Sequence, residues 1–109
     1  MIYYCEDKKA FYLESQNLTY AFCINKHGFL QHLYYGSRID REDLTSSVYF
    51  VDRGHGSNIA GAPRCESLNV YANECPTYGR SDYRESMLAF NFNGVRVGDL
   101  TYDSHYVYD

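Results

Sequence analysis

Short apolar and aromatic stretches alternate with polar turns in the first third of the chain, and this pattern predicts β-strands. Strands are expected at Ile2–Cys5, at residues 10–13 and at Leu18–Ile24, because each stretch is apolar or aromatic and is bounded by polar residues. Residues 29–35 could form a helical turn or a strand, but their place after a glycine turn and their paired tyrosines favour a fourth strand, which we expect to stop at Gly36.

Three polar segments are predicted to be the turns between these strands. Residues 6–9 are charged and can close a hairpin, and residues 15–17 offer polar turn residues. Residues 25–28 end in Gly28, and glycine readily adopts the positive φ that such a turn needs.

Residues 37–71 lack a regular hydrophobic pattern. They contain a charged run at residues 40–43 and a glycine-rich polar run at residues 52–63. An irregular region of this size within a compact domain is usually functional or disordered. We expect a long loop here, with one or two short elements, as the place to look for contacts outside the domain.

Residues 74–84 combine a tight turn with aromatic rings and charges. Pro76 and Gly79 bracket two residues, a spacing typical of a turn, and Tyr78 and Tyr83 flank it. Such side chains suit either structural bracing or hydrogen-bonded contact with a sugar or a partner chain.

Two more strands are expected in the last part of the chain, at residues 87–92 and 100–108. Asn93-Gly94 is a hairpin signal, and Gly98 follows it. Within the second strand, residues 102, 104, 106 and 108 are predicted to line one face.

Composition supports a single β domain over residues 1–109. A chain of 109 residues has the common size of one domain, and its thirteen Tyr and six Phe are residues that strands favour. The net charge of −4 argues against a nucleic-acid surface, which needs clustered Lys and Arg. No apolar run could span a bilayer and the start lacks the order of a secretory signal, so no membrane partner and a cytoplasmic location are expected.

The cysteines and histidines predict neither a metal site nor a cofactor. The four cysteines form no C-x-x-C pair, and the four histidines form no H-x-x-x-H pair, so reduced, packed thiols are expected. If the protein were exported, two disulfides and a glycosylated Asn17 would be the alternative.

Catalytic signatures are weak. The run at residues 54–57 resembles a phosphate loop in composition alone, because no Lys-Ser/Thr follows it, and no G-x-S-x-G elbow is present. Fourteen acidic residues allow a carboxylate pair of the glycosidase type, but composition cannot select one.

Several blocks in order resemble the start of bacterial α-galactosidases of glycoside hydrolase family 36. They are Met-Ile-Tyr-Tyr at the start, Leu-Thr-Tyr-Ala-Phe at 18–22, Gly-Phe-Leu-Gln-His-Leu-Tyr-Tyr-Gly at 28–36, Glu-Cys-Pro-Thr-Tyr-Gly-Arg-Ser-Asp-Tyr-Arg at 74–84, Asp-Leu-Thr-Tyr at 99–102 and Ser-His-Tyr at 104–106. The likeness covers nearly the whole chain.

This resemblance implies a non-catalytic, partial antiparallel β-sandwich that begins a larger enzyme. In that family a catalytic (β/α)8 barrel follows, with an aspartate nucleophile and an aspartate acid/base that remove terminal α-galactosyl groups from raffinose-type sugars. The barrel is absent from these 109 residues, so no catalytic residue is assigned and the chain alone is expected to be inactive.

The resemblance also implies roles for five residues. In tetrameric members the central loop reaches a neighbouring subunit's sugar pocket, and the matching substrate-binding residues here are Asp52 and Arg64. Tyr78, Asp82 and Arg84 are expected to order the domain and its packing. The departure from the family pattern at Glu85-Ser86 bears on loop geometry.

Three functions therefore stand as hypotheses. The first is a domain of an α-galactosidase that acts on an α-galactoside through the rest of the enzyme chain, in a homo-oligomer. The second is a free-standing carbohydrate-binding β module that uses exposed tyrosines, and the third is a purely structural oligomerisation domain.

Overall fold

A computed structural model describes residues 1–41, 43–48, 59, 62, 66–78, 84–98 and 100–108 of the chain. It contains two compact units, one formed by Met1–Val48 with Thr101–Asp109 and the other by Tyr49–Leu100. The assignment of residues 1–109 to one β domain of a larger enzyme stays a prediction.

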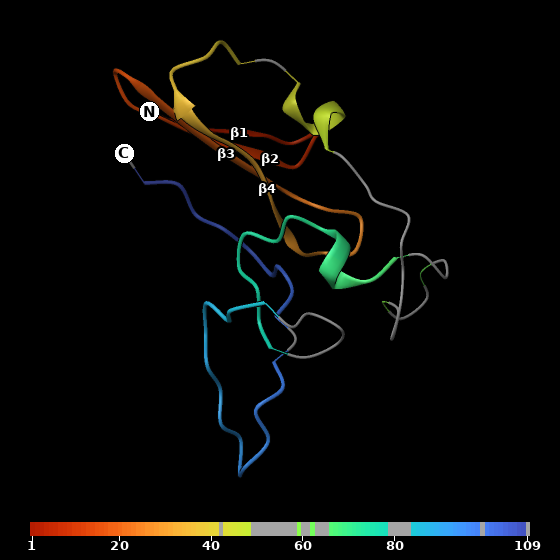
Figure 1. The fold of residues 1–109 in the computed structure, drawn as a ribbon. Coiled ribbons are helices and arrows are strands. Elements are labelled where there is room, and N and C mark those ends of the chain that lie inside the picture. The colour runs from red at the N-terminus through yellow and green to blue at the C-terminus, as the bar shows by residue number, and fades with distance from the viewer. Residues whose placement is uncertain are drawn as a thin grey trace. The chain divides into compact units, whose positions relative to one another are not determined.

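The first unit is a four-stranded antiparallel sheet in which sequence neighbours pair (Figure 1). Its strands are β1 (Ile2–Cys5), β2 (Ala10–Glu14), β3 (Leu18–Ile24) and β4 (Leu30–Ser37). All four overlap stretches predicted from the sequence, and the all-β fold class is confirmed.

The predicted turns are also present. Between β1 and β2 the Lys9 N–H donates to the Glu6 carbonyl at 3.2 Å, and Lys9 has a φ of 49°. Between β3 and β4 the Asn25 Oδ1 accepts the N–H groups of His27 and Phe29, both at 3.0 Å. Gly28 has a φ of 84°, a conformation that favours glycine, and it completes the turn.

The strand register sorts the side chains onto two faces, because paired residues in an antiparallel sheet share a face. One face is aromatic. Along it the Phe11 ring centroid lies 4.6 Å from that of Tyr4 and 4.8 Å from that of Phe22. Across the same face, Tyr20 packs against both Phe22 and Tyr35.

The other face carries small residues around one buried ring. Ala10, Ala21 and Cys23 are buried with Tyr12, and Leu44 packs against them. Leu44 begins η1 (Leu44–Ser47), a short 3₁₀ helix whose N-cap, Asp43, accepts a hydrogen bond from the Thr45 N–H. This packing covers part of the small-residue face.

Strand β4 differs from its prediction at both ends. It begins one residue later than expected and continues through Gly36 to Ser37, which pair with Thr19 and Leu18 of β3. The expectation that Gly36 stops the strand is wrong, because the glycine serves a close approach: a Cβ there would lie 2.7 Å from the Tyr34 hydroxyl. That hydroxyl donates to the Ser37 carbonyl at 2.9 Å.

Residues 100–108 do not form the predicted strand in the part of the chain that the structure describes. The Tyr102 N–H donates to the Gly28 carbonyl at 2.7 Å, and no ladder continues from it. The segment is held to the aromatic face by side chains instead, with the His105 ring 4.3 Å from Tyr4 and 4.7 Å from Phe11. Ring contacts have replaced the backbone ladder that the alternation predicted.

The described residues of the second unit form a short 3₁₀ helix, η2 (Leu68–Val70), and isolated bridges in place of strands. Residues 87–92 were expected to be a strand, which is wrong: they contribute one bridge between Leu88 and Thr77 and one between Phe92 and Val95. The Asn93-Gly94 turn itself is present, with φ values of 51° and 88°. A single hairpin pair without further strands gains too little packing to extend the ladder.

The cysteines in the described part of the chain are free thiols, as the sequence predicts. Cys5, Cys23 and Cys75 are free thiols, and burial raises the pKa of Cys23. In the ranges given above, no cluster of three or more His, Cys, Asp or Glu side chains could hold a metal ion. Within the same ranges no helix has the length and apolar character needed to cross a membrane.

An ion pair joins β2 to the segment that follows β4. Arg41 Nε and Nη2 donate to the two carboxylate oxygens of Glu14, at 2.9 and 2.8 Å, and the Glu14 side chain is 5% exposed. This bidentate geometry is the strong form of a carboxylate–guanidinium contact.

We expect Arg41→Ala to make folding less sensitive to acid. The guanidinium lowers the pKa of Glu14 from its ordinary value, so the pair stabilises the folded chain at neutral pH and this contribution is lost as pH falls through the folded-state pKa. Melting temperatures of the variant and the unchanged chain should therefore differ at neutral pH and converge in acid. Circular dichroism melts across that range measure the gap, and a gap that stays constant would contradict the expectation.

Candidate functional site

The structure describes two of the five residues to which the sequence assigned a role. Asp52, Arg64 and Asp82 lie outside the described residues, and their predicted roles stay predictions. Tyr78 and Arg84 belong to the second unit.

Arg84 contacts the backbone of the 3₁₀ helix η2. Its Nη1 donates to the Tyr71 carbonyl at 2.6 Å and its Nη2 to the Leu68 carbonyl at 2.8 Å. The Asn73 side chain also donates to the Leu68 carbonyl, at 3.3 Å. The Leu68 carbonyl also accepts the Tyr71 backbone N–H, at 3.3 Å, so Arg84 and Asn73 add side-chain bonds that brace this turn.

A buried carboxylate lies next to this helix, and sequence analysis did not single it out. Glu66 is 5% exposed and Tyr71 is 7% exposed, and the Tyr71 hydroxyl donates to Glu66 Oε2 at 2.8 Å. The Glu66 carbonyl accepts the Ile59 N–H at 3.0 Å. Burying a carboxylate is costly unless it is hydrogen-bonded, so the Glu66–Tyr71 pair anchors the end of the irregular region at residues 37–71.

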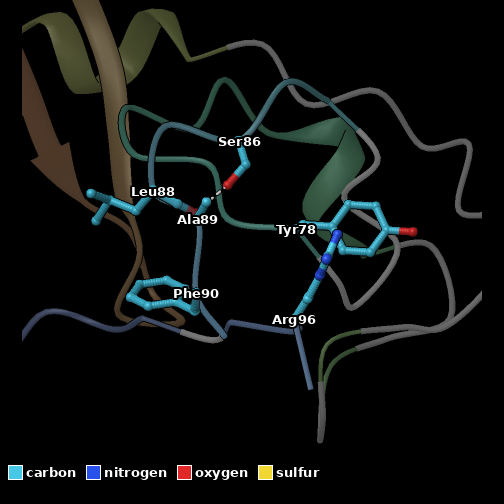
Figure 2. A pocket seen from close by; sticks show the side chains of 6 residues that line it. All are labelled: Tyr78, Ser86, Leu88, Ala89, Phe90 and Arg96. Atoms are coloured by element: carbon cyan, nitrogen blue, oxygen red, sulfur yellow. Dashed lines mark hydrogen bonds between the residues drawn. The ribbon is translucent and has the colours of Figure 1, made fainter. Parts of the chain in front are cut away.

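A pocket of about 320 Å³ opens on the second unit (Figure 2). In Figure 2 the Tyr78 ring and the Arg96 guanidinium lie together at one end, and the Leu88 and Phe90 side chains lie toward the other. The Ser86 hydroxyl donates a hydrogen bond to the Leu88 carbonyl. The pocket is lined by Tyr78, Ser86, Leu88, Ala89, Phe90 and Arg96.

Close packing holds two of the lining residues, Tyr78 and Phe90, against Gly98. The Gly98 N–H donates to the Tyr78 carbonyl at 3.0 Å, and Thr77 Oγ1 donates to the Gly98 carbonyl at 3.1 Å. A Cβ at position 98 would lie 2.7 Å from the Phe90 ring, so glycine is needed for the two segments to meet.

The described side chains that line this pocket suit binding. Glycoside hydrolysis of the usual kind uses two carboxyl groups on either side of the bond. None of the six lining residues carries a carboxyl group, whereas a phenol ring, a guanidinium and apolar side chains suit contact with a ligand or another protein segment.

Comparison with known proteins identifies the family. Residues 28–109 match the sequence profile of the glycosyl hydrolase family 36 N-terminal domain. The chain belongs to glycoside hydrolase family 36. Its resemblance to the start of such enzymes is thereby confirmed.

Similar family members are bacterial α-galactosidases. The chain is 35% identical over 107 residues to the bifunctional alpha-galactosidase/sucrose kinase AgaSK of Mediterraneibacter gnavus, and the match covers 95% of the chain and 11% of that protein. It is 30% identical over 108 residues to the alpha-galactosidase AgaA of Geobacillus stearothermophilus, and the match covers 96% of this chain and 14% of that protein.

Solved family 36 structures share the fold. The galactosidase domain of AgaSK superposes with a TM-score of 0.83 at 34% identity, covering 95% of this chain and 15% of that one. A variant of AgaA from Geobacillus stearothermophilus in complex with raffinose gives a TM-score of 0.76 at 28% identity, and the match covers 88% of this chain and 14% of that one. The chain thus spans about a seventh of the length of these structures.

We expect Tyr71→Phe to destabilise the second unit, because it removes the hydroxyl that donates to buried Glu66. The loss should be about 1–2 kcal/mol. Denaturant unfolding measures it, and hydrogen exchange of the amides of residues 66–78 localises it. Tyr106→Phe is the matched control, since Tyr106 is 78% exposed and its hydroxyl should contribute less than about 0.5 kcal/mol. Equal stability of the two variants would contradict the anchoring role of Tyr71.

Proposed function

We propose that this chain is the non-catalytic amino-terminal part of an α-galactosidase that removes terminal α-galactosyl groups from raffinose-type oligosaccharides. The observation that carries the proposal is the match to the galactosidase domain of AgaSK over 95% of the chain, with a TM-score of 0.83. Support for the substrate class comes from the AgaA variant that was solved with raffinose.

Hydrolysis belongs to the rest of the enzyme chain in this proposal. The AgaSK galactosidase domain is about seven times longer than the segment that matches, so most of that enzyme lies outside it.

The contribution of this chain is to subunit packing and to a neighbouring subunit's sugar pocket, in a cytoplasmic homo-oligomer that needs no cofactor. Asp52 and Arg64 contact the sugar, because a carboxylate accepts two hydroxyl protons and a guanidinium donates several hydrogen bonds in one plane. Tyr78, Asp82 and Arg84 order the packing, and the hydrogen bonds of Arg84 to the carbonyls of Leu68 and Tyr71 support that role.

The 109-residue chain should be inactive on its own. Incubation with a chromogenic α-galactoside is expected to give no release above that of a buffer blank, since the chain lacks the catalytic barrel of the family. Turnover that tracks the purified protein through a final chromatography step would overturn the assignment.

In the full-length enzyme, Asp52→Asn and Arg64→Lys should each raise the KM for raffinose about tenfold with little change in kcat, because they remove uniform binding contacts. Asp7→Asn is the control, since Asp7 lies on the exposed turn between β1 and β2 and should leave KM unchanged. If neither variant moves KM, the domain is a purely structural oligomerisation element instead.

A further inference from the structure

The first unit has a pocket of its own, on the small-residue face of the sheet. Its volume is about 340 Å³, at the small end of ligand pockets, which run from roughly 300 to 1,000 Å³. Buried Tyr12 and half-buried Cys5 come from the sheet, while charged side chains come from the first turn and from the segment after β4. The lining residues are Tyr3, Cys5, Lys8, Tyr12, Arg41 and Asp43.

An aromatic ring and a guanidinium are held together on the pocket lining. The Arg41 guanidinium carbon lies 4.6 Å from the centroid of the Tyr3 ring, and Tyr3 is 42% exposed. The bonds of Arg41 to Glu14 and to the Met1 sulfur use Nε and Nη2. Across the described residues the Nη1 hydrogens have no partner, so they are available to a ligand.

An ion pair is held in place on the same lining. Lys8 Nζ lies 3.0 Å from Asp43 Oδ2. The Thr45 N–H and hydroxyl both bond to Asp43 Oδ1, and together with Lys8 they lower the pKa of this carboxyl. The carboxylate is therefore ionised and oriented, and the ammonium group retains further donor capacity.

Charge balance decides what kind of ligand the pocket suits. Lys8 is neutralised by Asp43, and Arg41 is neutralised by Glu14, so no net charge is left to select an ion. What remains is a partly exposed aromatic ring, with the Arg41 guanidinium over it, beside fixed donors and acceptors. That combination suits a ligand with an apolar face and several hydroxyl groups.

We propose that this pocket binds an uncharged pyranose sugar, at a site separate from the sugar contacts proposed for Asp52 and Arg64. The ring of Tyr3 packs against the apolar face of the sugar, while Lys8, Arg41 and Asp43 hydrogen-bond its hydroxyls. The site stands on the first unit alone, so it does not depend on the proposed function of the whole enzyme.

Raffinose titrated into the 109-residue chain tests the proposal, followed by two-dimensional ¹H–¹⁵N NMR. Saturable shifts are expected for amides around Tyr3, Lys8 and Asp43. Tyr3→Ala should weaken binding about tenfold, since it removes the ring, whereas Tyr3→Phe should retain it. Lys8→Met changes an exposed side chain with little effect on folding, and it should weaken binding several-fold.

A control variant distinguishes this site from sugar binding elsewhere on the chain. Tyr35→Ala removes a 67% exposed tyrosine on the aromatic face of the sheet and should not change the affinity. The proposal is overturned if raffinose gives no saturable shifts, if Tyr3→Ala and Lys8→Met both bind as the unchanged chain does, or if galacturonate binds more tightly than galactose.

Discussion

The register between β2 and β3 is the constraint on which the first unit depends. It pairs Ala10 with Cys23 and Tyr12 with Ala21, and so places three small side chains around one buried ring. Because side chains alternate along a strand, a slip of one residue would exchange this face with the aromatic face. Such a slip would remove the packing of Leu44, the pocket beside it and the ring contacts of His105.

The strands of the first unit could be predicted because local pattern and turn chemistry agree there. The turn from Asn25 to Gly28 leaves few alternatives, since the glycine has to take the positive φ and the Asn side chain bonds to the following amides. The last two strands failed for the opposite reason. Residues 87–92 and 100–108 have alternating side chains and flank the Asn-Gly turn. Alternation alone does not determine whether such a segment pairs with another strand or packs through its side chains.

The site was less predictable than the fold because its contacts join residues that sequence spacing does not relate. Glu66 is one of many acidic residues in the sequence, and its burial beside Tyr71 follows from the path of the chain. Arg84 was singled out through a family block, yet the two carbonyls to which it donates, on Leu68 and Tyr71, could not be inferred from that block. The pairing of Arg41 with Tyr3 likewise joins the first strand to the segment after the last one.

The irregularity in β4 has a consequence for aligning this chain with other family members. Ala21 of β3 pairs with Tyr34 while its neighbour Phe22 pairs with His32, so Leu33 is an extra residue on β4. A homologue with a regular strand here would be one residue shorter, and a gap placed anywhere else would pair residues of opposite faces. Position 33 is therefore the place at which an insertion or deletion between relatives can be absorbed without moving either end of the strand.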